Sequence, residues 1–186
     1  MPARKRCCIA LFLLIAALPS TAQVLGPQPA IHEGKDAATQ TDYALFTIPN
    51  ELTADAKPAT LTLQCSRTPG KHRQIDIYLN PDGTPIDSYR PPEASTDTAR
   101  YPIGKIAMNF DGYKIFKLQW EQLPSGEYHY MNPGGLTSNL EGPIYFMQWM
   151  FNTRVTRFQV TKTSPQLEFH DSNLVDGARK HPLCAP

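Results

Sequence analysis

A strict alternation of apolar and polar residues at Thr60–Ser66 is the feature that most constrains the fold of this chain. Leu61, Leu63 and Cys65 fall on one side of the segment, and threonine, glutamine and serine fall on the other. A period of two residues is that of a half-buried β-strand, because successive side chains point to opposite faces of a sheet. The segment therefore predicts a strand that directs Cys65 into a core.

Further strand-like segments follow, separated by turn residues. The apolar residues of 75–79 alternate in the same way after a turn at Thr68-Pro69-Gly70, which predicts a hairpin with the first strand. Asp111-Gly112 between two apolar runs is a strong signal for a second hairpin. We also predict strands at 43–48, 103–110, 113–121, 127–131, 153–163 and 167–170. The pattern indicates a mostly β protein, an antiparallel β-sandwich of about seven strands, with one or two short helices near the C-terminal end.

Helices and loops are predicted from fewer signals. Residues 174–180 are expected to form a helical turn or two that delivers Cys184 to the body of the protein. Segment 141–152 is apolar on nearly all sides, so its periodicity leaves strand and helix open, although Pro143 after Glu141 favours a short helix. The proline-rich stretch 84–100 is predicted to be an exposed loop.

The N-terminus has the organisation of a secretory signal peptide. Arg4, Lys5 and Arg6 precede an apolar run from Ile9 to Leu18, and small residues follow at 20–22. The apolar run is shorter than the roughly 20 residues that cross a bilayer, which argues against an uncleaved anchor. We expect cleavage after Ala22, a periplasmic or secreted protein, and no integral membrane segment after cleavage. The predicted organisation is a signal peptide at 1–22, a flexible leader at 23–42 and a single β-sandwich domain at 43–186.

The formal charge of the whole chain is +1, and part of its positive charge lies in the signal peptide. Nucleic-acid binding requires clustered lysine and arginine that neutralise phosphates, so this class of partner is not expected. A polybasic contact with anionic lipid is excluded on the same ground.

Removal of the signal peptide leaves two cysteines, Cys65 and Cys184. An oxidising compartment favours a disulfide between them, which would pin two layers of sheet through the core and contribute on the order of 4–5 kcal/mol. Two free thiols and an intermolecular bridge are the alternatives. A metal site built on these cysteines is not favoured, because neither has a second cysteine at ligand spacing.

The sequence carries no motif that points to catalysis, a cofactor or a metal. The five histidines lack His-x-x-x-His and His-Glu-x-x-His spacing, and the serine-hydrolase pattern Gly-x-Ser-x-Gly is absent. We therefore predict no catalytic residue, no cofactor and no metal ligand. An enzyme would be favoured if His129 or His170 lay within hydrogen-bond reach of a carboxylate at the floor of a pocket.

Aromatic residues are densest between positions 120 and 151. Aromatic side chains anchor interfaces, but they fill cores more often. The candidate binding surface comprises Trp120, Tyr128, Tyr130 and Trp149. If these rings instead face inward, they belong to the core and the surface does not exist.

The order of these features over residues 60–184 resembles a known family. Leu61-x-Leu63-x-Cys65 precedes Ile75-Asp76-Ile77-Tyr78-Leu79, then Asn109-Phe110-Asp111-Gly112 and Trp120, then Phe158-Gln159-Val160-Thr161 and finally His181-Pro182-Leu183-Cys184. The chain looks like the periplasmic proteins typified by VasI of type VI secretion clusters, and more loosely like the invasion-associated locus B family. The resemblance implies a small exported β-rich protein and brings no catalytic residue with it.

These observations favour an exported, non-enzymatic β-sandwich that is a binding or accessory module of the bacterial envelope. Its expected partner is a protein or an envelope component. The alternatives are a hydrolase acting on an envelope polymer, and a purely structural or stress-related exported domain.

Overall fold

The computed structural model describes residues 26–51, 58–71, 73–91, 103–110, 115–130 and 153–184, with the backbone alone at 103–105, 110 and 115–119. Several sequence predictions lie outside these residues: the signal peptide at 1–22, the loop at 92–100, the Asp111-Gly112 turn, Trp149, and the choice between strand and helix at 141–152.

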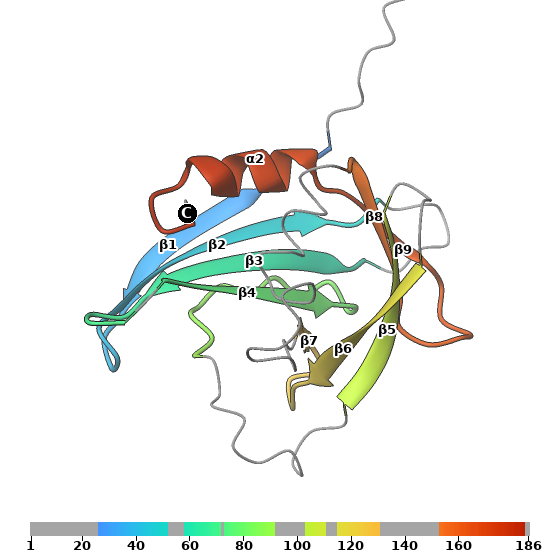
Figure 1. The fold of residues 1–186 in the computed structure, drawn as a ribbon, viewed down its shortest axis with the longest axis horizontal. Helices are drawn as coiled ribbons and strands as arrows, with labels where there is room; N and C mark the ends of the chain where they lie inside the picture. Colours follow the sequence, from blue (N-terminus) through green and yellow to red (C-terminus); the bar gives the residue numbers. More distant parts are fainter. Residues whose placement is uncertain are drawn as a thin grey trace, which may run out of the picture.

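Nine strands form a continuous antiparallel sheet in the order β1-β2-β3-β4-β7-β6-β5-β8-β9 (Figure 1). The predicted fold class, a mostly β antiparallel sandwich with a short C-terminal helix, is confirmed, with more strands than the sequence indicated. The strands are β1 (Ala30–Asp36), β2 (Thr41–Pro49), β3 (Thr60–Arg67), β4 (Arg73–Asn80), β5 (Ile103–Phe110), β6 (Ile115–Gln122), β7 (Tyr128–Tyr130), β8 (Val155–Gln159) and β9 (Leu167–His170).

The expected flexible leader at 23–42 is wrong in its second half. Strand β1 lies within it and pairs with β2 along its full length, from Ala30 opposite Thr47 to Asp36 opposite Thr41. Strand β1 was not predicted because it is mostly exposed on both faces, so the sequence of β1 has no alternation of apolar and polar residues.

The two halves of the sheet run in crossing directions and enclose one core (Figure 1). The short strand β7 links them, because it pairs with β4 on one side and β6 on the other. A single apolar cluster includes Phe46 and Leu63 from the first half and Trp120 and Phe158 from the second. Burial of these side chains between the two layers is the main stabilising contribution to the fold.

The outer face of β2, β3 and β4 is also covered. Ile86 is buried against Leu45 and Tyr78 in a second, smaller apolar cluster. The predicted exposed loop at 84–100 is confirmed for most of its described part, 84–91, which has no helix or strand and is largely exposed. The exceptions are Ile86, which is buried, and Arg90, whose backbone is hydrogen-bonded to the sheet.

Helix α2 (Ser172–Lys180) closes the core beside β1 and β2 (Figure 1). It buries Leu174, Val175 and Ala178, as expected for an amphipathic helix that packs on a sheet. No helix in the described part of the chain is long and apolar enough to cross a bilayer.

The predicted disulfide between Cys65 and Cys184 is present. Cys65 is fully buried on β3, and Cys184 lies just after α2. The bond therefore ties the end of the helical segment to the first half of the sheet. The expectation that the disulfide would join two layers of sheet is wrong, because Cys184 lies in the segment after α2 and not on a strand.

Candidate functional site

The aromatic residues predicted as a binding surface lie mainly in the core. Trp120 and Tyr130 are 0% and 2% exposed, and Tyr128 packs against the same cluster. Trp120 sits opposite Tyr130 in the sheet and meets Phe158 edge-on, with ring centroids 5.8 Å apart. Trp120, Tyr128 and Tyr130 therefore belong to the core or pack against it, and the proposed surface is wrong for them. Trp149 lies outside the described residues.

His129 points to the other face of β7, where it meets two carboxylates. Its Nε2 lies 3.1 Å from Oδ1 of Asp76, and its Nδ1 lies 3.9 Å from Oε2 of Glu121. Its ring stacks on Tyr78 at 4.8 Å between centroids. Burial raises the pKa of Tyr78 well above its usual range, and the nearby Asp76 and Glu127 act in the same direction, so Tyr78 stays neutral.

The carboxylates around His129 have partners from several elements. Asp76 accepts hydrogen bonds from the side-chain amides of Gln64 at 3.3 Å and Gln74 at 3.2 Å. Glu127, which is 3% exposed, accepts from Nε of Arg90 at 3.1 Å. Because these buried charges are paired within the protein, the arrangement fits a polar network that joins the segment at 84–91 to the sheet.

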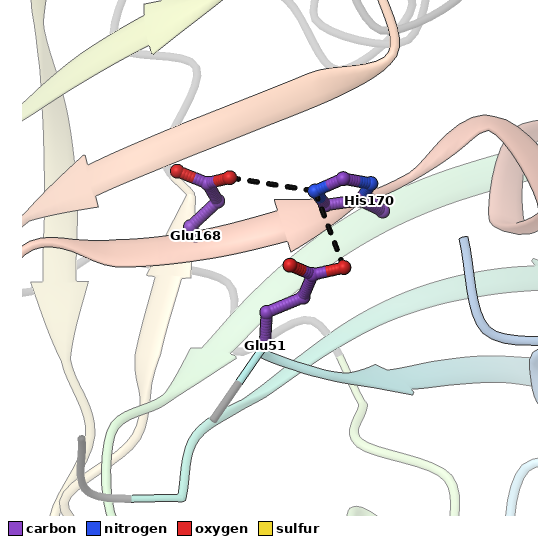
Figure 2. A group of neighbouring side chains, drawn as sticks. All are labelled: Glu51, Glu168 and His170. Atoms are coloured by element: carbon purple, nitrogen blue, oxygen red, sulfur yellow. Dashed lines mark hydrogen bonds and ion pairs between the residues drawn. The ribbon is translucent and has the colours of Figure 1, made fainter. Parts of the chain in front are cut away.

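A second cluster combines Glu51, Glu168 and His170 (Figure 2). Glu168 and His170 are two residues apart on β9, so their side chains share one face of the strand. Glu51 follows the end of β2. Nε2 of His170 lies 3.3 Å from Oε1 of Glu51 and 3.3 Å from Oε1 of Glu168.

A backbone hydrogen bond holds this cluster together between the segment after β2 and strand β9. The N–H of Glu51 donates to the carbonyl oxygen of Glu168 at 2.9 Å, so the segment that continues β2 lies against β9, the last strand in the order. This hydrogen bond places Glu51 beside residues that are far away in the sequence.

Arg157 orients one of the three side chains. Its Nε donates to Oε2 of Glu168 at 2.7 Å, which leaves Oε1 directed to His170. Partial burial raises the pKa of Glu168, but the hydrogen bond and charge of Arg157, together with His170, outweigh burial and hold that pKa below its ordinary value. Glu168 is therefore a carboxylate at neutral pH.

The backbone at Gly26 packs closely against the backbone of His170. A Cβ at Gly26 would lie 2.1 Å from the carbonyl oxygen of His170, so only glycine permits this approach. The side-chain amide of Asn173 donates to the carbonyl oxygen of Gly26. These contacts restrict the position of His170 at the end of β9.

Two of the three residues of this cluster have a recognisable spacing in the sequence. Glu168-x-His170 on a predicted strand places two potential ligands on one face. This spacing differs from His-x-x-x-His and His-Glu-x-x-His, the two metal motifs that the sequence lacks. Glu51 carried no signal. The four remaining histidines are placed differently: His129 lies in the buried network, His181 pairs with Glu33 at 3.2 Å, His32 stacks on Tyr43, and His72 is outside the described residues.

No family model, curated protein or solved structure matches the chain.

Proposed function

We propose that the protein is an exported β-sandwich module of the bacterial envelope that binds a protein partner by strand addition at β1. Its compartment is inferred from the signal-like N-terminus, and the buried Cys65–Cys184 disulfide is compatible with an oxidising environment. The resemblance to the VasI-like family, and more loosely to the invasion-associated locus B family, agrees with this proposal.

The observation that carries the binding role is the edge strand β1. It spans seven residues and stands first in the strand order, and among the described residues only β2 pairs with it. An edge strand presents alternate N–H and C=O groups on its outer side, which can pair with an extended segment of another protein.

The side chains of β1 add an apolar anchor to this edge. Ile31 is 54% exposed, the only large apolar side chain so exposed in the described part of the chain. Glu33 and Lys35 follow it with both signs of charge. An extended peptide with an apolar side chain opposite Ile31 and mixed charges beyond it fits this edge.

Site-specific photo-crosslinking tests the binding role. A photoreactive amino acid replaces Ile31 in one bait and Gln166, in the exposed turn before β9, in the control bait. We expect one envelope protein to crosslink at position 31 and not at 166. In a pull-down without crosslinking, with the unmodified chain as reference, Ile31→Lys should reduce capture of that protein by about tenfold or more, because an interface anchor is lost. Equal capture with Ile31→Lys, or equal crosslinking at both positions, would overturn strand addition at β1.

The location is tested separately. Cell fractionation should recover the protein from the periplasm or medium with Gln23 as its first residue. Recovery of an unprocessed chain in the cytoplasm would contradict export.

A hydrolase acting on an envelope polymer is the second candidate, favoured by the 3.1 Å approach of His129 to Asp76. Histidine–carboxylate pairs of this kind occur in acid–base catalysis. Incubation with purified peptidoglycan should then release soluble fragments, and His129→Gln should abolish the release. No release by the unmodified protein rules this candidate out for that polymer.

A further inference from the structure

We propose that Glu51, Glu168 and His170 form a zinc site. The three ligand atoms lie within 4.8 Å of one another, and Figure 2 shows both carboxylates directed to the same nitrogen of His170. This combination of one imidazole nitrogen and two carboxylate oxygens occurs among protein ligands of zinc.

The two nitrogen–oxygen distances agree with a tetrahedral ion. Zinc binds nitrogen and oxygen ligands at about 2.0–2.2 Å, so the ligand–ligand edges of a tetrahedron measure about 3.3–3.6 Å. Nε2 of His170 is 3.3 Å from an oxygen of each glutamate. A hydrogen bond from nitrogen is usually nearer to about 2.9 Å, so two equal separations of 3.3 Å would be a long three-centre hydrogen bond. A shared ion accounts for the same two separations at ordinary metal–ligand distances.

The surroundings of the cluster resemble those of a built metal site. Arg157 holds Oε2 of Glu168 and leaves Oε1 to face His170, which is the role of a residue that orients a ligand without binding the metal. Gly26 packs against His170 and fixes the backbone of that ligand. The two carboxylates match the charge of a divalent cation.

Three protein ligands leave one position of a tetrahedral ion open to water or to a group on a binding partner. The ion would also cross-link the segment after β2 to β9, where the N–H of Glu51 already donates to the carbonyl of Glu168. The site is independent of strand β1, so its test does not depend on the proposed function.

Calorimetric titration with Zn²⁺ tests the site. The full chain is used with the Cys65–Cys184 disulfide intact, and with Cys7→Ser and Cys8→Ser so that free thiols do not compete. We expect one ion per chain, and an affinity at least tenfold lower in Glu51→Gln and in His170→Gln. Co²⁺ should give the intense visible absorption of a tetrahedral site, and this absorption should weaken in the same variants.

The matched control is Glu33→Gln, which removes the carboxylate of the His181 pair, a histidine with a single exposed acidic neighbour. Its affinity should equal that of the parent. Circular dichroism establishes that each variant folds, and Glu51→Gln, at a half-exposed position, provides the reading if His170→Gln does not fold. Absence of one-to-one binding, or equal affinity in Glu51→Gln and Glu33→Gln, would overturn the proposal.

Discussion

Gln64 and Arg90 form a reciprocal pair of hydrogen bonds between a buried side chain and a backbone. The N–H of Arg90 donates to Oε1 of Gln64 at 2.9 Å, and Nε2 of Gln64 donates to the carbonyl oxygen of Arg90 at 2.8 Å. Gln64 is fully buried. Its side-chain amide gives the backbone of the segment at 84–91 the pair of hydrogen bonds that a neighbouring strand would otherwise give. This pair explains why a proline-rich stretch docks on the sheet.

Replacing this amide should destabilise the protein. Gln64→Leu leaves the N–H and C=O of Arg90 without these partners, and we expect the free energy of unfolding to fall by about 2–4 kcal/mol. Gln74→Leu is the matched control, because Gln74 is half-buried and donates to Asp76 at 3.2 Å; its loss should be below about 1 kcal/mol. Urea denaturation measures both values. Similar losses would show that the Arg90 contact contributes little.

The disulfide should contribute more than a local contact. Cys65 and Cys184 are separated by 119 residues, and removal of a bridge that closes a long loop typically costs about 2–5 kcal/mol. We expect this loss for the double variant Cys65→Ala and Cys184→Ala in urea denaturation. A reductant should lower the midpoint of the parent and leave that of the double variant unchanged. An unchanged parent midpoint under verified reduction would contradict the prediction.

Two glycines with similar backbone angles should respond differently to alanine. Gly70 and Gly83 have φ of +74° and +80°, so alanine costs about 1–2 kcal/mol at either position. Only at Gly83 would the new Cβ meet another group, 2.8 Å from Cβ of Pro58, whereas Gly70 faces open space. We expect Gly83→Ala to cost at least about 1 kcal/mol more than Gly70→Ala. Thermal denaturation of the two variants side by side decides it, and equal losses would show that the Pro58 segment moves away.

In the turn between β1 and β2, the hydroxyl of Thr39 makes the largest contribution to the low pKa of Asp36. The hydroxyl and N–H of Thr39 donate to Oδ2 of Asp36 and hold the pKa of that carboxyl below its ordinary 3.8. Because the folded-state pKa is depressed, the stabilisation is present above about pH 3.8 and is lost as the pH falls through the folded-state value. Thr39→Val should raise the pKa of Asp36 in a carboxyl NMR titration.

Asp82 provides an internal control for that titration. The N–H of Thr84 donates to it at 2.9 Å and holds its pKa low, and Thr39 takes no part in this contact. The pKa of Asp82 should therefore be the same in both proteins. A parallel change in Asp36 and Asp82 would indicate a general effect of the substitution.

The sequence located strands best where the apolar side chains of a strand all point to one face. Residues 167–170 were predicted as a strand and form β9 with the same bounds, and the hairpin of β3 and β4 follows from alternating residues on both sides of a turn at Gly70. Apolar side chains on one face give a two-residue period that can be recognised without knowing the partner strand, even in β3, whose polar face is also buried. The exposed edge strand β1 lacks this period and was missed.

The aromatic residues show what a two-residue period does not predict, namely which face of a strand is turned to the core. Trp120 and Tyr130 were recognised as a group, but sequence alone did not decide whether their shared face meets solvent or core. That choice depends on the crossing of the two halves of the sheet, which packs Trp120 and Tyr130 into one core with Phe46 and Leu63 of the first half.

The pairing of β3 with β4 and the pairing of Cys65 with Cys184 were predicted from the sequence alone, since alternation and a single available partner are local or countable properties. The meeting of Glu51 with Glu168 and His170 was decided only by the tertiary structure. It requires the last strand of a bent sheet to lie against the segment that follows β2, and no residue pattern near Glu51 encodes which strand will lie there.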